Sequence, residues 1–289
     1  MSLWLDFMGA QIRYIQTPSY GRVRVAEAGD PANPPLLFLH GIGGHLEAYC
    51  KNLVALSDEF HVIAYDYVGH GMSEKLEIEY TPLVLVDHLK EVMDVFGIQK
   101  AHLSGESLGG WVSGIFATEY PDRVDRLMLN TAAGLPILTE KGKQDLADLA
   151  RLSKEAAKQG MNYDAIHNRM KWLFHPNNYD MITDELIRTR LTHYTHPDMA
   201  KSAPRVNAMM AVHDQYLTPL EKIQCETLFL WTEDNPVHDV ETARICSGKV
   251  AKAQMYVMKQ DSCHWPQYEH PEEFNDVTRM FFQTGKIPA

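Results

Sequence analysis

The most informative segment of this chain of 289 residues reads Gly105-Glu106-Ser107-Leu108-Gly109-Gly110. An apolar run typical of a strand, residues 101–106, precedes the serine directly, and a helical pattern, residues 108–119, follows it directly. A strand that turns so sharply into a helix leaves no room for side chains two residues to either side of the turn, which explains the glycines at 105 and 109. The turn lifts the serine hydroxyl out of the sheet, above a helix N-terminus that stabilises negative charge. The segment therefore predicts a nucleophilic serine at the edge of a sheet.

Strand and helix patterns alternate on both sides of this segment. Strands are expected at residues 36–40, 61–66, 101–106 and 126–130, and helices at 46–56, 82–96 and 108–119. Residues 12–16 and 22–28 alternate in polarity and predict an edge hairpin, and residues 66–73 predict a tight loop without a chemical role. The alternation resumes with strands at 227–231 and 254–258 and helices near 240–246 and 271–284. Because such alternation builds parallel sheets, we expect an α/β fold with a mostly parallel, doubly wound sheet.

The chain between residues 136 and 216 has a different pattern. Helical periodicity dominates at residues 141–159, 163–174, 184–195 and 199–215, and strand signals are missing. We therefore expect one sheet domain, residues 1–135 and 217–289, that is interrupted once by an all-helical cap, residues 136–216.

A serine nucleophile needs a base and donors for the oxyanion. His264 follows the last expected strand, in Asp261-Ser262-Cys263-His264-Trp265-Pro266, which places it at the edge of the sheet where ligands of open α/β sheets bind. We predict that His264 is the base for Ser107. The loop His40-Gly41-Ile42-Gly43-Gly44 follows a central strand, and the backbone N–H groups of Ile42 and Leu108 are the expected oxyanion hole.

Together these residues resemble the α/β-hydrolase superfamily over nearly the whole chain. The segment His264-Trp265-Pro266-Gln267-Tyr268-Glu269-His270-Pro271-Glu272-Glu273-Phe274-Asn275 resembles the meta-cleavage product hydrolases, carbon–carbon bond hydrolases of aromatic hydrocarbon catabolism. The resemblance implies a substrate site formed by Gly41, Gly43, Trp265 and a cap arginine, Arg190, with Arg188 as the alternative. That arginine would bind the carboxylate of an aromatic-derived substrate.

The resemblance implies a 2-hydroxy-6-oxo-hexa-2,4-dienoate as the substrate, with ketonisation of the dienol followed by hydrolysis of the C5–C6 bond. Glu106 departs from the family, which often has asparagine before the nucleophile, and is found there in ordinary esterases. A carboxylesterase with the same serine chemistry is therefore one alternative. A non-hydrolytic member, either a ligand-binding protein or a cofactor-free oxygenase, is the other.

The third group of the catalytic triad departs from the pattern of the superfamily. The superfamily places an aspartate four residues after the tryptophan that ends the strand, and in Trp231-Thr232-Glu233-Asp234-Asn235-Pro236 that position holds Asn235. An asparagine orients an imidazole but does not stabilise its charged form. We predict that Asp234, shifted by one residue, is the acid. Asp239, or no carboxylate at all, remains an alternative.

Composition limits the remaining possibilities. The formal net charge of −11 and the absence of a basic cluster argue against nucleic acid or an anionic membrane surface as a partner. The four cysteines have no CxxC spacing, no apolar run is long enough to span a bilayer, and the N-terminus does not resemble a signal peptide. We therefore expect a cytoplasmic protein with reduced thiols and no cofactor or metal, and His193 and His196 as surface residues. Assembly into a homo-oligomer is left open.

Overall fold

The computed structural model describes residues 2–287, and for residues 153–159 only the backbone is described. Its centre is an eight-stranded sheet with the order β1-β2-β4-β3-β5-β6-β7-β8. The hairpin of β1 (Gln11–Thr17) and β2 (Gly21–Ala28) is antiparallel, β2 also pairs antiparallel with β4, and every other pairing is parallel. The expected α/β fold with a mostly parallel sheet is confirmed.

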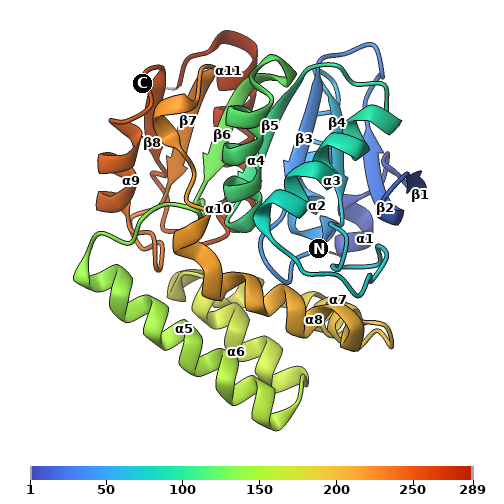
Figure 1. Cartoon of the computed structure of the whole chain (residues 1–289), viewed down its shortest axis with the longest axis vertical. Coiled ribbons are helices and arrows are strands. Elements are labelled where there is room, and N and C mark those ends of the chain that lie inside the picture. Colours follow the sequence, from blue (N-terminus) through green and yellow to red (C-terminus); the bar gives the residue numbers. More distant parts are fainter. Residues whose placement is uncertain (1, 288–289) are drawn as a thin grey trace.

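The parallel strands are the core of the molecule (Figure 1). They are β3 (Pro35–Leu39), β4 (His61–Tyr65), β5 (Ala101–Glu106), β6 (Val124–Asn130), β7 (Glu226–Trp231) and β8 (Ala253–Val257). All residues of β4 and β5 are buried, because helices cover both faces of the sheet. The hydrophobic cluster on one face includes α3 (Pro82–Val95), α4 (Leu108–Glu119) and α9 (Val240–Ser247). The cluster on the other face includes α1 (Leu3–Asp6), α2 (Cys50–Leu53), α10 (Pro266–Glu269) and α11 (Pro271–Thr284).

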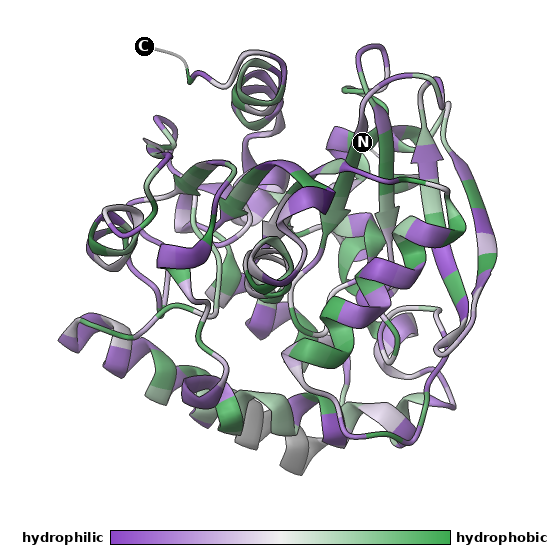
Figure 2. Cartoon of the chain, turned by 45° about the horizontal axis from the view of Figure 1, so that its top comes forward, coloured by the Kyte–Doolittle hydropathy of each residue, from purple (hydrophilic) through white to green (hydrophobic). Residues whose placement is uncertain are grey.

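The covering helices α3, α9 and α11 are amphipathic, whereas α4 is buried on every side from Leu108 to Ala117. Hydrophobic and hydrophilic residues lie side by side on the same ribbons (Figure 2). Thr81 accepts a hydrogen bond from the backbone N–H of Val84 and begins α3, whose first residue is Pro82. In α11, Phe274, Phe281 and Phe282 are buried, and Gly285 ends the helix in the left-handed conformation.

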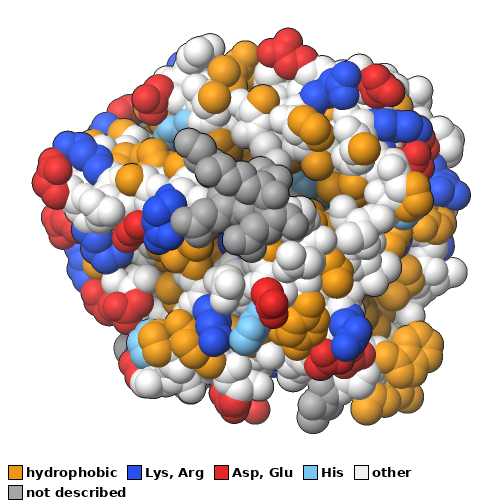
Figure 3. All heavy atoms as spheres, turned by 90° about the horizontal axis from the view of Figure 1, so that it is seen from below, with side chains coloured by type: hydrophobic (Ala, Val, Ile, Leu, Met, Phe, Trp, Pro, Cys, Tyr) orange, Lys and Arg blue, Asp and Glu red, His pale blue; other side chains and the backbone are white. Residues whose placement is uncertain are grey.

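The chain between β6 and β7 is helical throughout its regular elements. It contains α5 (Glu140–Gln159), α6 (Tyr163–Leu173), α7 (Asp184–Tyr194) and α8 (Met199–Ala208), and these helices lie beyond one end of the sheet (Figure 1). The expected single helix 199–215 is instead α8, which contains Pro204, followed by a 3₁₀ segment, Met209–Gln215. Figure 3 shows this end of the molecule, where hydrophobic side chains are interspersed with charges of both signs. Among the described residues, no helix is long and apolar enough to cross a membrane.

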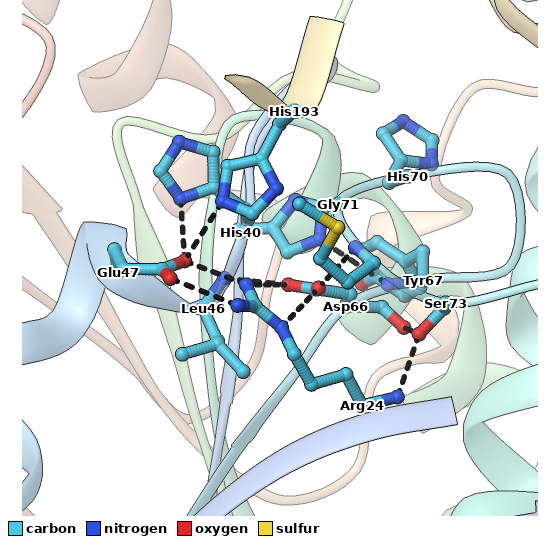
Figure 4. Close-up of polar contacts among 12 residues, drawn as sticks. Arg24, His40, Leu46, Glu47, Asp66, Tyr67, His70, Gly71, Ser73 and His193 are labelled. Atoms are coloured by element: carbon cyan, nitrogen blue, oxygen red, sulfur yellow. Dashed lines mark hydrogen bonds and ion pairs between the residues drawn. The ribbon is translucent and has the colours of Figure 1, made fainter. Parts of the chain in front are cut away.

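A buried ionic network joins the edge hairpin to two loops at the carboxyl edge of the sheet (Figure 4). Arg24 of β2 binds both carboxylate oxygens of Glu47, at 2.9 and 2.7 Å, and its Nε donates to Asp66 at 2.7 Å. The Asp66 carboxylate also accepts the backbone N–H groups of Leu46 and Met72, at 2.8 and 2.7 Å. One guanidinium therefore compensates the buried carboxylate of Asp66 and the partly buried carboxylate of Glu47, and residues 66–73 form a tight, internally bonded loop.

We predict that Arg24→Met destabilises the protein more than most single substitutions do. The change leaves Glu47 and Asp66 without their cation, and an uncompensated buried charge costs about 3–5 kcal/mol of the free energy of unfolding. Denaturant unfolding followed by circular dichroism measures this, and Arg188→Met, which removes an exposed arginine, is the control. A loss below about 1 kcal/mol would contradict the role given to the network.

Candidate active site

Ser107 occupies a strained turn between β5 and α4. Its backbone angles, φ 53° and ψ −117°, lie in a region that non-glycine residues rarely adopt. A Cβ atom at Gly105 would lie 2.1 Å from the carbonyl oxygen of Gly109, and one at Gly109 would lie 2.0 Å from that of Leu39. The two glycines are therefore required by close backbone approach, as the sequence predicts.

A small cavity lies above this turn, between the sheet and the helical insert. The loops after β3, β5 and β8 contribute to its wall, and so do α6 and α7. The residues that line it are Gly41, Ile42, Gly44, Glu106, Ser107, Arg169, Leu173, Arg190, His264 and Trp265. Ser107 and His264 thus line the same cavity as Arg190, Trp265 and the glycine loop.

The tautomer of His264 follows from the hydrogen bonds of Asn235. The Nδ2 group of Asn235 donates to the carbonyl oxygens of Pro236 and His238, at 3.2 and 2.5 Å, so its Oδ1 atom faces His264. The Nδ1 atom of His264 lies 2.7 Å from that Oδ1 and must carry the proton that it donates. The Nε2 atom of the neutral imidazole is therefore left with a lone pair, as a general base requires.

The two candidate aspartates do not reach this imidazole. The Asp234 side chain is mostly exposed, and its carboxylate lies 3.5 Å from Nε2 of His175. Asp239 caps α9, where it accepts the backbone N–H of Thr242 at 2.9 Å and the hydroxyl of Thr139. The prediction that Asp234 orients His264 is wrong in this structure, and the neutral Asn235 occupies that position.

The local backbone explains why an amide stands there. Two carbonyl oxygens take the Nδ2–H groups of Asn235, so an aspartate at this position would turn a carboxylate oxygen toward both of them. The chain is also strained in this loop, because Val237 has a positive φ of 67° that a β-branched residue rarely adopts. The loop geometry thus selects a neutral partner for His264.

Glu106 is the carboxyl group that does contact His264. Its side chain is buried, its Oε2 accepts the backbone N–H of Gly41 at 2.7 Å, and its Oε1 lies 3.2 Å from Nε2 of His264. Burial raises the pKa of Glu106 to about 8, although the Gly41 N–H opposes this shift. Burial, assisted by the positive charge of Arg169, lowers the pKa of His264 to about 3. The two groups therefore form a neutral pair at pH 7.

Arg190 is buried in the cavity wall. Its Nη2 is 3.4 Å from the carbonyl oxygen of Gly43, and among the described residues its Nε and Nη1 atoms have no acceptor. Its Cζ lies 4.9 Å from the centre of the Trp265 ring, a cation–π contact. The alternative, Arg188, is exposed and pairs with Asp184 at 2.6 Å. Of the two arginines, only Arg190 lines the cavity.

Arg169 is a second cavity arginine that the sequence did not single out. It comes from α6, lines the same cavity, and its Cζ lies 5.2 Å from the centre of the Trp172 ring. No ion pair joins it to a carboxylate within the described part of the chain. With Arg190, it gives the cavity two guanidinium groups whose charge is available to an anionic ligand.

The expected oxyanion donors are unused by the protein. Neither the Ile42 nor the Leu108 backbone N–H donates to another group within residues 2–287. Gly43 has a positive φ of 63°, and a Cβ atom there would lie 2.0 Å from the hydroxyl of Tyr194. Gly43 therefore allows the loop to pack closely against Tyr194 of α7, and the N–H of Ile42 has no protein acceptor among the described residues.

A separate cluster of His45, Glu47 and His193 has the residue types of a metal site. His193 is buried, contrary to expectation; it stacks on His45 with ring centres 4.2 Å apart, and its Nε2 lies 3.5 Å from Glu47 (Figure 4). The same Oε2 atom of Glu47 accepts Nη2 of Arg24 at 2.7 Å. A metal ion would have to share this oxygen with a guanidinium, so the cluster fits a link between α7 and the core better than a metal site.

Comparison with known proteins agrees with this fold. Residues 34–271 match the family described as alpha/beta hydrolase fold, and the chain belongs to that family. It is similar to a 2-hydroxy-6-oxononadienedioate/2-hydroxy-6-oxononatrienedioate hydrolase of Comamonas testosteroni and to a 2-hydroxy-6-oxo-6-phenylhexa-2,4-dienoate hydrolase of Burkholderia cepacia. Each is 28% identical over 91% of this chain and 92% of the relative. These matches support a hydrolase that resembles the meta-cleavage product hydrolases.

Solved structures show the same fold. The meta-cleavage product hydrolase CumD from Pseudomonas fluorescens IP01 aligns with a TM-score of 0.77 at 24% identity, over 95% of this chain and 98% of that one. A putative lipase from Acinetobacter baumannii AYE aligns with a TM-score of 0.83 at 20% identity, over 98% and 96%. The fold alone therefore does not separate carbon–carbon bond hydrolysis from ester hydrolysis.

The geometry around His264 predicts a ranking of two neighbouring substitutions. Asn235→Ala removes the acceptor that fixes the imidazole, and we expect kcat to fall roughly 10- to 100-fold because the base is no longer held in position. Asp234→Asn changes an exposed carboxylate and should leave kcat within about twofold. Steady-state kinetics on whichever substrate is turned over measures both variants, and the reverse order would contradict the assignment of Asn235.

Proposed function

We propose that this protein is a serine hydrolase that cleaves the C5–C6 bond of a 2-hydroxy-6-oxo-hexa-2,4-dienoate type of meta-cleavage product. The observation that carries the proposal is Arg190, a buried arginine that lines the same cavity as Ser107 and His264 and has two donor atoms without a partner among the described residues. Buried N–H groups of a guanidinium that have no acceptor are costly unless a ligand supplies one. A carboxylate oxygen is a charged acceptor that suits either of these groups.

The substrate would lie along the cavity with its carboxylate on Arg190 and its reacting carbonyl at Ser107. Trp265 packs against the same guanidinium, so a flat conjugated chain bound there would contact the indole ring. Ketonisation of the dienol moves a proton to C5 and makes C2 a carbonyl. The oxygen at C2 then accepts electrons through the C3–C4 double bond when the C5–C6 bond breaks.

The proposed acyl transfer uses the serine and the imidazole in two stages. The Ser107 hydroxyl gives its proton to Nε2 of His264 as Oγ bonds to C6, and the N–H groups of Ile42 and Leu108 stabilise the oxyanion. Cleavage of the C5–C6 bond leaves an acyl group on Ser107 and a dienolate, whose C2 oxygen takes the proton from Nε2 of His264, so that a 2-hydroxypenta-2,4-dienoate departs and the imidazole is neutral again. Water, deprotonated by His264, then attacks C6 and releases a carboxylic acid.

Glu106 favours one second candidate, a carboxylesterase with the same nucleophile and base. The buried carboxyl group beside Ser107 stands where the carbon–carbon bond hydrolases often have asparagine. An ester substrate would need no ketonisation step and no carboxylate on Arg190. The two functions therefore differ in their dependence on that arginine.

We expect the purified protein to bleach the visible absorbance of a ring-fission dienoate and to release the matching carboxylic acid. Ser107→Ala should lower kcat by at least about 10³-fold, because the nucleophile is lost. Stopped-flow absorbance and product analysis measure both. Rapid hydrolysis of p-nitrophenyl esters together with dienoate turnover no faster than in buffer would select the carboxylesterase instead.

A second test separates the substrates by charge. Arg190→Gln should lower kcat/KM for the dienoate about 100-fold, because a charge-assisted contact with the substrate carboxylate is lost, but should lower it less for a neutral p-nitrophenyl ester. Arg188→Gln, on the same helix and exposed, is the matched control and should leave both values within about twofold. Equal losses on the two substrates would argue against Arg190 as the carboxylate site.

A further inference from the structure

The pair of Glu106 and His264 has a property that the proposed mechanism does not use. Nε2 of His264 is the atom that must take the proton of Ser107, and Oε1 of Glu106 lies 3.2 Å from that atom. The other imidazole nitrogen faces only the neutral amide of Asn235, at 2.7 Å. No carboxylate contacts Nδ1 within the described residues, so Glu106 is the acidic group placed to act on this base.

We infer that Glu106 is a positioning and charge-compensating residue that replaces the missing aspartate of the triad, and that its ionisation switches His264 between a capped and a competent base. In the protonated state of this proposal, the proton is on Oε1, which lies 3.2 Å from Nε2 and faces its lone pair, while Oε2 accepts the Gly41 N–H at 2.7 Å. The lone pair is then occupied and does not take the Ser107 proton. In the ionised state, the lone pair is free, and the adjacent negative charge stabilises the imidazolium that forms.

The proton balance of the competent state is simple. Ser107 loses its proton to Nε2 as Oγ bonds to the carbonyl carbon, and the imidazolium is flanked by the Glu106 carboxylate and the Asn235 amide. The proton leaves Nε2 for the leaving group, and Glu106 remains ionised throughout. Glu106 therefore acts through His264 and exchanges no atom with the substrate.

The surroundings of Glu106 identify which group titrates. Arg169 of α6 and Arg190 of α7 face it with positive charge, and both lower its pKa, although burial outweighs them and leaves it at about 8. The phenols of Tyr49 and Tyr67, which also lie near it, are buried, and their pKa values are well above 10. His264 is neutral down to a pKa of about 3. Among these groups Glu106 alone titrates between pH 6.5 and 9.5.

The inference rests on the proposed roles of Ser107 and His264, but its test does not require the natural substrate. The probe is a fluorophosphonate, and the readout is the second-order rate constant for labelling of Ser107 from pH 6.5 to 9.5. Glu106→Gln is the informative variant, because its amide keeps an acceptor for Gly41 and a permanent donor toward His264. It thus holds the site in the capped state at every pH.

We expect the wild-type rate constant to rise with a midpoint near pH 8, and the ratio of wild type to Glu106→Gln to grow about 30-fold over this range, as one ionisation with that pKa requires. A purely structural role for Glu106 would give a ratio that does not change with pH. Glu269→Gln is the matched control: Glu269 is a second buried carboxyl, bonded to the backbone N–H of Cys263 at 2.9 Å. Its replacement should leave the midpoint in place.

If the labelling rates of wild type and Glu106→Gln depend on pH in the same way, the inference is wrong, but the proposal that the protein is a serine hydrolase is unaffected. An absence of labelling in the folded wild type at any pH would overturn both. Circular dichroism establishes whether Glu106→Gln is folded. Should it not fold, the wild-type profile still decides, because a midpoint below pH 7 would exclude Glu106 as the controlling group and one near 8 would support it.

Discussion

The backbone at Ser107 is the constraint on which the arrangement of the cavity depends. A conformation of this kind costs of order 1–3 kcal/mol, and the surrounding structure must hold it in place. Ser107 donates its N–H to Asn130 of β6 at 3.2 Å, and its carbonyl oxygen accepts from Trp111 and Ala133 at 3.1 and 2.9 Å. Hydrogen bonds to β6, to the residues after it and to α4 fix the backbone of the turn. They therefore fix the position of Glu106 as well as that of Ser107. The position of Glu106 against Gly41 is therefore a consequence of the same turn.

The charges in the cavity compensate one another only when an anion is bound. At pH 7 the imidazole and the Glu106 carboxyl are both neutral, while Arg169 and Arg190 carry positive charge and no carboxylate partner among the described residues. Glu106 resists ionisation because its burial outweighs both guanidinium groups and the Gly41 N–H. A substrate carboxylate on Arg190 would neutralise one of these guanidinium groups. The resting site thus holds excess positive charge, which matches an anionic substrate better than a neutral one.

The sequence predicted the elements that local patterns specify and missed those that depend on how the insert packs. The predicted strand 101–106 and helix 108–119 agree with β5 and α4 at both ends, and the turn at Ser107 fixes the boundary between them. Arg169 was not predicted as a cavity residue, since helical periodicity does not show which face of α6 meets the sheet. His193 was expected at the surface for the same reason, and its contact with Glu47 joins residues 146 positions apart in the chain, 193 − 47. The sequence shows Asn235 at the position where the superfamily has its aspartate, and Asp234 was predicted instead because a carboxylate was expected to orient the imidazole. The carbonyl groups of Pro236 and His238, which accept from the Asn235 amide, show that Asn235 is the partner of His264.

The location of the carboxyl group relative to the imidazole changes what it does to the base. A carboxylate at Nδ1 orients the ring and stabilises its charge without touching the nitrogen that takes the serine proton. A carboxyl group at Nε2 meets that nitrogen directly, so its own proton competes with the proton of the nucleophile. Because the loop carbonyl groups require an amide at position 235, the acidic group lies on the opposite side of the ring, next to Nε2. There Glu106 stabilises the imidazolium when it is ionised and blocks the base when it is protonated. A site built in this way couples the activity of its base to the ionisation of Glu106, and hence to any bound charge that shifts that ionisation.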